Sequence, residues 1–547
     1  MGSTFHGLET AKRGMYAQQS ALYVTGHNIA NANTPGFSRQ RVSFVTSEPY
    51  PAAAMNRPQI PGQMGTGVYA GTIERVRESF LDIQYRNENN KLGYWESRAA
   101  SLSKMEDIMN EPTENGLAAV MGEFWQSLQD LSVYPENEGT RQVVLQRGQA
   151  VVDTFHYLNE SLTSIKNDFR NEIGINLQDI NSILSQIGDL NRQIGEVEPH
   201  GYLPNDLYDQ RDLLVDKLSQ YVSIKVNKTS SGGDPQAIAE GQYQIQLVDN
   251  NGNALLGADG KPIQLVSGTD YVQLGFQGDT EISFAVPAAI KDLAVYDSKG
   301  KTMTTTIPIS DSNGEITFSL GKLRGLIESF GYEAPSTDAS GNPTTIEKGI
   351  YPDMLAKLDK LAYSFANIFN HTHTAGYTLE GVNGKDFFKM AAGSAVDFSN
   401  KEAYKGAAKD ILLTDLRPDG IAASANGTGT NAGDGQNALN LADIPSMLLT
   451  SANQYSAIET GTLNSFYEAM IGKLGVEALQ ANRLTSNSQI LSQSVDEKRQ
   501  SVSSVSLDEE MANVIKFQHA YNAAARQITV VDEMLDKIIN GMGTGGR

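Results

Sequence analysis

The 547-residue sequence predicts an α+β protein that is elongated and divided into several domains. Apolar residues recur every seven positions near both ends of the chain, and a long apolar stripe with helical spacing runs through residues 138 to 196. Between about 221 and 330, apolar and polar residues alternate instead, as in strands. We therefore expect a coiled-coil-like terminal domain and a helical rod, both formed by the two chain ends, with an inserted β-rich domain.

The first predicted helix carries a narrow apolar seam. Residues spaced by seven form it, namely Leu8, Met15, Leu22 and Ile29. A strict seven-residue repeat is typical of a coiled-coil seam rather than of the wide apolar face of a globular helix. Pro35 is expected to end the helix because proline disfavours the α conformation in the residue before it, and Gly36 permits a turn.

The last predicted helix mirrors the first. Ser506 and Glu509 have capping-box spacing at its start, and Gly541 is the expected stop. The seam residues here are Leu507, Val514, Tyr521, Ile528 and Leu535, and the expected second heptad position holds Met511, Gln518, Ala525, Asp532 and Ile539. Such narrow seams stabilise a lone helix poorly, so the helices should pair with each other or with copies in neighbouring molecules. The alternative is an ordinary two-helix contact inside one globular domain.

Helical patterns also predict the rod, over residues 73–110, 114–134, 349–370 and 460–500. Gly174 and Gly188 are expected to bend or split the long helix at 138 to 196. In the β-rich part, Asn251-Gly252 predicts a hairpin turn, and the alternation of Ile282, Phe284 and Val286 predicts a strand. Residues 392 to 452, rich in Gly, Ala, Asn and Asp, predict a loop-rich excursion with a few short strands.

These patterns set the predicted domain boundaries. Residues 1–36 and 505–547 form the terminal helix pair. Residues 37–220 and 331–504 form the rod, which includes the loop-rich excursion at about 392–452, and residues 221–330 form the inserted β-rich domain.

Composition narrows the classes of function. A formal net charge of −21 argues against non-specific binding to nucleic acid or to anionic membranes. We find no apolar run long enough for a transmembrane helix, and the first 30 residues lack the pattern of a cleaved signal peptide. Cysteine is absent, which excludes disulfide frameworks and thiolate sites. Its absence fits either chance in a cytosolic protein or export in an unfolded state.

No residues are expected to serve as catalytic groups or to hold a metal or a cofactor. His371 and His373 have no third ligand at standard spacing, so we expect a polar loop after a helix that ends near Asn370. The carboxylates of DLYDQRD, at 206 to 212, are expected to form a solvated helix face. The histidines of the terminal helices, His6, His27 and His519, are expected at surface or interface positions.

The two ends of the chain resemble a known family, the axial proteins of the bacterial flagellum. ALYVTGHNIANANTPGFSRQRV, at 21 to 42, is similar to the N-terminal signature shared by rod, hook and hook-associated proteins. SVSLDEEMANVIKFQHAYNAAARQITVVDEMLDKII, at 504 to 539, resembles their C-terminal signature. Two internal segments, NDLYDQRDLLVDKLSQYVSI and FNHTHTAGYTLEGVNGKDFF, point to the hook-associated members. The N-terminal motif residues are Asn28, Asn31, Asn33, Thr34, Pro35, Gly36 and Phe37.

The resemblance implies a structural adaptor, not an enzyme, at the junction between hook and filament. It implies export through the flagellum's own type III channel without a cleaved signal peptide, and assembly as a ring at the hook tip. The implied partners are further copies of the chain, the hook protein, a second hook-associated protein and an export chaperone, with no nucleic acid and no membrane insertion. It also implies that the terminal segments order on assembly. The alternatives are a hook or distal-rod subunit, or a secreted protein whose β insert binds or acts on a ligand.

Overall fold

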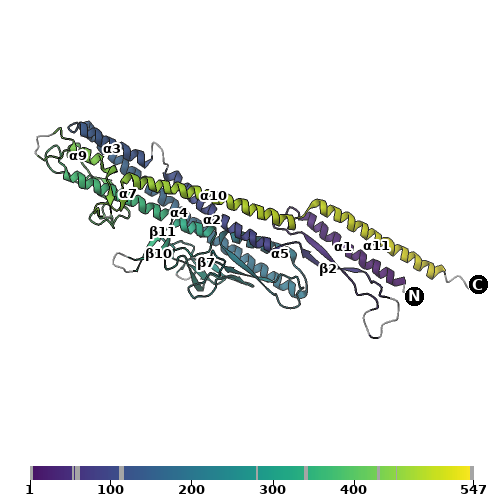
Figure 1. Cartoon of the computed structure of the whole chain (residues 1–547). Helices are drawn as coiled ribbons and strands as arrows, with labels where there is room; N and C mark the ends of the chain where they lie inside the picture. The colour runs from purple at the N-terminus through teal and green to yellow at the C-terminus, as the bar shows by residue number, and fades with distance from the viewer. Residues whose placement is uncertain are drawn as a thin grey trace, which may run out of the picture.

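The computed structural model describes residues 4–51, 55, 62–109, 116–278, 281–337, 343–427, 432–450 and 452–541. The molecule is long and narrow, with both chain ends at one extremity (Figure 1). The chain travels to the far extremity and back, so segments distant in sequence lie side by side. Parts of the sequence predictions, such as residues 114–115, 428–431 and 542–547, lie outside the described residues.

At one extremity, two helices and a hairpin form the terminal region. These are α1 (Thr4–Ala30), β1 (Gln40–Thr46), β2 (Val68–Arg75) and α11 (Leu507–Gly541). The two strands are antiparallel, and Arg13 of α1 donates to the carbonyl oxygen of Thr66 (3.3 Å), just before β2. Helix α1 therefore packs between α11 and the hairpin.

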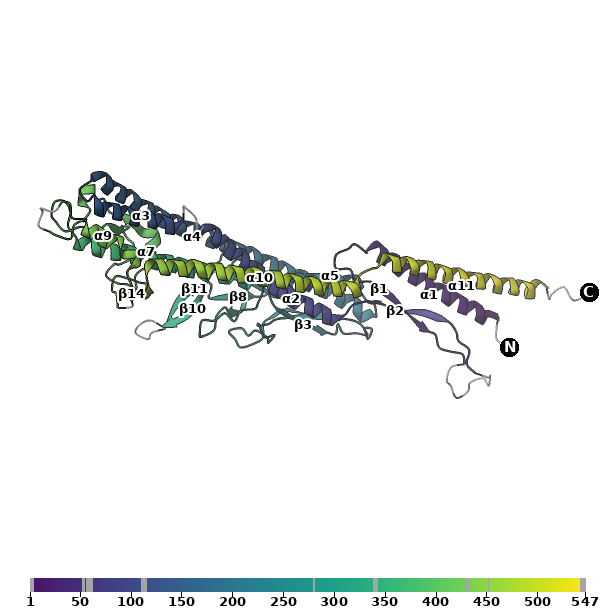
Figure 2. The ribbon, with the colours of Figure 1, turned by 45° about the horizontal axis from the view of Figure 1, so that its top comes forward.

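Long helices build the rod. They are α2 (Ser79–Met109), α3 (Leu117–Val133), α4 (Glu138–Val197), α5 (Asn205–Tyr221), α7 (Ile350–Ala375) and α10 (Leu463–Ser503), together with the short α6 (Lys322–Phe330) and the 3-10 turn η1 (Glu198–His200). Helices α2 and α10 are neighbours although more than 350 residues separate them, and Figure 2 shows α10 along the outside of the rod. The predicted helices at 114–134, 138–196, 349–370 and 460–500 are confirmed to within a few residues at their ends. The one predicted at 73–110 begins only at Ser79, because the residues up to Arg75 belong to β2.

Helix α4 is a single unbroken helix, so the prediction that Gly174 and Gly188 bend or split it is wrong. These glycines instead allow the β-rich part to pack closely against α4. A Cβ on Gly188 would lie 2.9 Å from the ring of Tyr271, and one on Gly174 would lie 2.9 Å from the carbonyl oxygen of Phe284. Between them, Asn181 of α4 exchanges two 2.8 Å hydrogen bonds with the backbone of Leu274.

Two small antiparallel sheets follow α5 in the chain. One has the order β3 (Ile224–Thr229), β4 (Gln242–Leu247), β5 (Gln264–Ser267) and β6 (Asp270–Tyr271); the other has β7 (Gln273–Gly275), β8 (Asp292–Tyr296) and β9 (Met303–Pro308). The turn at Asn251-Gly252 is confirmed, since Val248 bridges Ala254 across it. Residues 282–286 form one isolated bridge rather than the predicted strand, because the backbone there turns toward α4.

The remaining elements lie on the rod and at its far extremity. A hairpin of β10 (Tyr332–Thr337) and β11 (Pro343–Lys348) precedes α7. Residues 388 to 461 hold short elements, as predicted for much of that span: β12 (Phe388–Met390), α8 (Ala407–Asp410), β13 (Ile411–Leu413), η2 (Pro418–Gly420), α9 (Gln436–Ala442), η3 (Ile444–Ser446), β14 (Leu449–Thr450) and β15 (Thr460–Gly461). Among the described residues, no helix has the length and apolar character needed to cross a membrane.

Candidate assembly surface at the joined chain ends

Helices α1 and α11 pair antiparallel. Gly7 lies beside Val531 near one end of the pair, and Asn28 lies within 3.2 Å of Glu510 at the other. On α11, the side facing α1 repeats with alternating spacings of three and four, the pattern of a coiled-coil seam. The two chain ends thus form one elongated helical unit.

The structure places most of the predicted seam along this contact. Leu8, Met15, Leu22, Ile29, Val514, Tyr521, Ile528 and Leu535 are all half-buried. Leu507 is 51% exposed, because α11 begins there before it meets α1. The buried residues of α1 were not part of the predicted seam; they are Ala11, Ala17, Ala21, Val24, Thr25 and Asn28, of which three are alanines. Alanine lets two helices and a hairpin approach closely. Because alanine is only weakly hydrophobic, the pattern of large apolar residues did not reveal these positions.

The predicted second heptad position is wrong. Met511 and Ile539 are exposed, and the positions that accompany the seam are Glu510, Phe517, Ala524 and Val531. These lie three residues after each seam residue rather than four. A polar residue, Glu510, occupies one of them because it is buried against Asn28 and Arg39. A search for apolar residues alone therefore identified the wrong second heptad position.

The motif NANTPGF forms the turn that leaves α1. The side chain of Asn31 donates to the carbonyl oxygen of His27 (3.1 Å) and accepts from Thr34 (3.1 Å), which satisfies the end of the helix. Gly36 has φ +80°, a conformation that favours glycine, and a Cβ there would press on Leu213 at 3.2 Å. Phe37 returns to stack edge-on against His27, with ring centres 5.5 Å apart. Asn33, Thr34 and Pro35 face solvent.

A buried polar joint connects this turn to the start of α11. Asn28 donates to the carbonyl oxygen of Gln40 (2.8 Å) and accepts from its backbone N–H (3.0 Å). Arg39 donates to Glu510 (2.8 Å) and Glu509 (2.7 Å). Its backbone N–H also donates to the carbonyl oxygen of Ser503, the last residue of α10. Residues from both ends of the sequence therefore fix the angle at which the terminal pair leaves the rod.

Below this joint, most of the acidic face of α5 is buried, which corrects the sequence prediction for Asp209 and Asp212 of DLYDQRD; Asp206 is exposed, as predicted. Arginines from four segments converge on Asp209, Asp212 and Asp216. The ion pairs are Arg75 with Asp209 and Asp212, Arg77 with Asp212, Arg86 with Asp212 and Asp216, and Arg499 with Asp216. Burial opposes ionisation of Asp212, yet Arg77, Arg75 and Arg86 together hold the pKa of its carboxyl well below the ordinary value. We call this set the neck network.

The histidine prediction is also wrong in structure. Helix α7 continues to Ala375, and His373 is fully buried rather than in a loop. Its Nδ1 lies 2.6 Å from the carbonyl oxygen of Lys385, and its Nε2 accepts from the N–H of Ala422 (3.0 Å), so the neutral ring carries its proton on Nδ1. Burial lowers the pKa of His373 to about 4. His371 stacks on Tyr455 instead.

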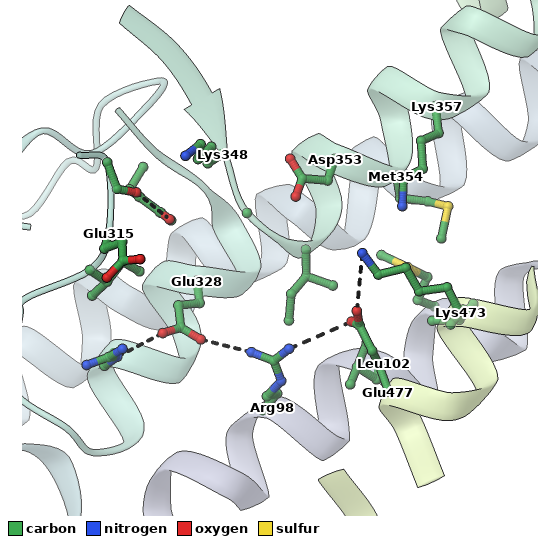
Figure 3. Close-up of a pocket in the computed structure, with 18 of the residues that line it drawn as sticks. Arg98, Leu102, Glu315, Glu328, Lys348, Asp353, Met354, Lys357, Lys473 and Glu477 are labelled. Atoms are coloured by element: carbon green, nitrogen blue, oxygen red, sulfur yellow. Dashed lines mark hydrogen bonds and ion pairs between the residues drawn. The ribbon is translucent and has the colours of Figure 1, made fainter. Parts of the chain in front are cut away.

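A cavity of about 620 Å³ opens on the rod between α2, α6, α7 and α10 (Figure 3). At its base Arg98 bridges Glu328 (3.1 Å) and Glu477 (3.7 Å). Lys348, Lys357 and Lys473 also line it. Arg98 thus joins α2 to α6 and α10, and Lys473 pairs with Glu477 within α10 (3.7 Å). No group of three or more potential metal ligands occurs among the described residues. The cavity walls therefore bear structural ion pairs.

The terminal region leaves much apolar surface uncovered. On α11, Met511, Ile515, Val530, Met534 and Ile538 are exposed, and on α1, so are Tyr16 and Tyr23. The hairpin adds Phe44, Val45 and Tyr69. Extended apolar surface of this kind on several sides of one slender unit is typical of a protein interface. This surface is suited to contact with further protein.

Three family models match the chain. The helical domain of flagellar hook-associated protein FlgK covers residues 102–388, the flagella basal body rod protein model covers 8–37, and the C-terminal model of the basal body rod FlgEFG proteins covers 498–541. The chain is 45% identical to flagellar hook-associated protein 1 of Bacillus subtilis (strain 168) over the full length of both. It is 23% identical to the protein of the same name from Escherichia coli (strain K12), covering 97% and 99% of the two chains.

A solved structure has a similar fold. It is that of the flagellar hook junction protein FlgK from Burkholderia pseudomallei, with a TM-score of 0.53 and 15% identity, covering 76% of this chain and all of that one. The two short models match α1 with the turn after it, and the end of α10 with α11. The FlgK model matches α3 to α7 and all of the β-rich part. The chain therefore belongs to the family of flagellar hook-associated protein 1.

Proposed function

We propose that the chain is the structural adaptor between the flagellar hook and the filament, and that it assembles there as a ring. The proposal rests on one observation. The terminal helices match models of flagellar rod and hook proteins, whereas the long helical part of the chain matches the model of hook-associated protein FlgK. Shared ends let a subunit continue a common tube, and a distinct outer part lets it present a different surface to the next component of the filament. The relatives are structural flagellar proteins, which supports a role without catalysis.

The terminal pair is the proposed self-assembly element. Its seam residues are Leu8, Met15, Leu22, Ile29, Leu507, Val514, Tyr521, Ile528 and Leu535, and the exposed apolar residues around the seam would meet neighbouring copies. A pair this slender buries little by itself, so neighbours would supply the rest of its stabilisation. The inner unit would then consist of residues 1–36 and 505–547. The rod would consist of 37–220 and 331–504, and the outer β-rich domain of 221–330.

The partners depend on this position. The chain would contact further copies of itself, the hook protein on one side and a second hook-associated protein on the other, with an export chaperone beforehand. It would reach the outside of the cell through the flagellar export channel without a cleaved signal peptide. The absence of cysteine suits passage in an unfolded state. Its place is then extracellular, at the hook–filament junction.

Electron microscopy of cells that lack the chain tests the proposal, together with an assay of flagellin in the medium. Complete hooks without filaments, and free flagellin outside the cells, are the expected result. Cells without hooks would mean that the chain is a rod or hook subunit. Normal filaments would overturn the adaptor role and direct attention to binding by the β-rich part.

A further inference from the structure

Helix α10 carries apolar residues on two opposite faces. One face, with Leu474, Ala478 and Ala481, is buried against the rod. The opposite face exposes Val476, Leu479 and Ile490, and Leu479 is 73% exposed. An ordinary surface helix is polar on its outer side. Apolar residues on both sides indicate that α10 has a second partner, which the single chain does not provide.

The outer face of α10 also carries a positive charge. From Gly472 to Gln493 the exposed charged side chains of α10 are Arg483, on this face, and Lys473, which lies 3.7 Å from Glu477. Glu477 is half-buried and lies 3.7 Å from Arg98 on the cavity side of the helix. Figure 3 shows Lys473 and Glu477 on α10 at the rim of the cavity. The outer face of α10 is therefore apolar with one cation, Arg483, in a chain whose net charge is −21.

The outer face of α4 has the opposite charge. Ile175 is 59% exposed there, and Asp168 and Asp179 are exposed within about two turns on either side of it. At about 100° per residue, these three residues lie within about 40° of one another around the helix. The basic residues of this stretch are engaged by other parts of the chain: Lys166 pairs with Glu347, and Arg170 donates to the carbonyl oxygen of Val286.

The two faces lie at matching heights along the rod. Lys104 of α2 stands over the ring of Phe169 of α4, at 4.9 Å. Arg98, six residues earlier, reaches Glu477 of α10, and Arg499 stacks on Tyr85 at 4.0 Å. Helices α2 and α10 are therefore antiparallel, which places Lys104, and with it Phe169, level with the residues just before Lys473. Both α4 and α10 run from the far extremity toward the neck (Figure 1).

We propose that α10 of one copy packs against α4 of the next copy, side by side in the ring. With the rods at equal height, Ile175 meets Val476 and Leu479, and Asp179 faces Arg483. This inference rests on the proposed function, since it requires copies of the chain to stand next to each other. It names a contact between the rods, separate from the contacts of the terminal pairs. Because the two faces differ, the contact is head-to-tail, which is the kind that closes rings.

The absence of cysteine makes the test direct. A chain with Ile175→Cys and Leu479→Cys would replace the deleted wild-type chain in cells, and isolated flagella would be treated with a mild oxidant. We expect a ladder of covalent dimers, trimers and larger species on a non-reducing gel, which a reductant collapses. Either single-cysteine variant should give no ladder. The matched control joins Leu479→Cys to Val133→Cys, an exposed position at the end of α3, and should give none either.

Charge reversal gives a second measurement that does not depend on disulfide geometry. Arg483→Glu alone and Asp179→Lys alone should each reduce the number of attached filaments, and the double variant should recover it. Flagella that assemble with the paired cysteines but give no ladder, or reversals that fail to recover each other, would overturn the contact and leave the adaptor role intact. A ladder from the Val133 control would also overturn it. Normal filaments in cells without the chain would instead refute the proposed function itself.

Discussion

Asn28 and Gln40 exchange two hydrogen bonds across the NANTPGF turn, at 2.8 and 3.0 Å, as two residues of neighbouring strands would. Asn28 also reaches Glu510, so one amide connects the end of α1, the start of the hairpin and the start of α11. The side chain is 1% exposed, and water cannot replace what it donates and accepts. The geometry of the terminal pair depends on this contact more than on the exposed part of the motif.

We therefore expect Asn28→Ala to free the backbone of Gln40. Leaving these buried groups without partners costs about 2 kcal/mol, which corresponds to roughly thirtyfold faster hydrogen exchange at the Gln40 amide. Exchange would be measured by mass spectrometry on isolated flagella. Asn33→Ala, in the exposed part of the same motif, is the control and should leave the rate unchanged. Equal rates in both variants would mean that Asn28 does not hold the joint.

The seam gives a second prediction. Leu22→Asp places a charge in the half-buried contact between α1 and α11, so filament attachment should be lost. The helical circular dichroism of the rod should remain, because Leu22 lies in the contact between α1 and α11, whereas α1 meets the rod further on, where His27 pairs with Asp206 of α5. Gln19→Asp, exposed on the same helix, should behave as wild type. Motile cells with Leu22→Asp would show that assembly does not need the seam.

The neck network should be costly to break. Asp212→Ala leaves Arg75, Arg77 and Arg86 facing one another without their shared carboxylate. Removing one partner from a buried ionic cluster costs about 3 to 5 kcal/mol. Urea unfolding of the purified chain measures this. Asp189→Ala, an exposed residue paired with Arg192 on α4, should change the free energy of unfolding by less than about 0.5 kcal/mol.

Two glycine substitutions should act in opposite directions. Gly188→Ala forces a methyl group toward Tyr271 and the carbonyl oxygen of Thr269, and should destabilise the chain by about 1 to 3 kcal/mol. Gly472→Ala, on α10, meets nothing within 4 Å and should stabilise it by about 0.5 to 1 kcal/mol. Melting temperatures report both changes. A neutral Gly188→Ala would mean that the β-rich part can move away from α4.

Acid should weaken the far end of the rod through His373. Burial lowers the pKa of His373 to about 4, below its ordinary 6.5, so the unfolded chain binds this proton more readily. The stability that this residue contributes is complete above pH 6.5 and falls as the pH drops toward 4. Between pH 7 and 5 the loss is about 2 kcal/mol. His373→Gln should flatten this part of the pH dependence of unfolding, and an unchanged slope would contradict the assignment.

The helices of the rod followed from their 3.6-residue periodicity, which long amphipathic segments express strongly. The buried polar residues could not be found in this way. Asp212 and His373 belong to segments that pattern alone presents as a solvated face and a loop. Burial is possible only because each has partners. Arg75 and Arg86 pair with Asp212, and the backbone of Lys385 and Ala422 bonds to His373. Those partners lie up to 137 residues away, and local pattern does not contain them.

Glycine and alanine were misread for a related reason. Gly188 signals a break when read locally, but its role is to admit a strand that is more than 80 residues further on. Ala17 and Ala21 carry little hydrophobic signal, yet each is only 1% exposed. Small residues report close approach, and the approaching element has to be known before they can be interpreted.

The pairing of α2 with α10 has a consequence for the timing of folding. A chain that emerges with its N-terminus first exposes the groove of α2 long before residues 463 to 503 appear to fill it. The neck network likewise lacks Arg499 until then. The rod therefore completes only when about nine-tenths of the polypeptide is free, and until that moment the molecule remains open. If the chain is exported through a narrow channel, as proposed, late closure separates transport from folding.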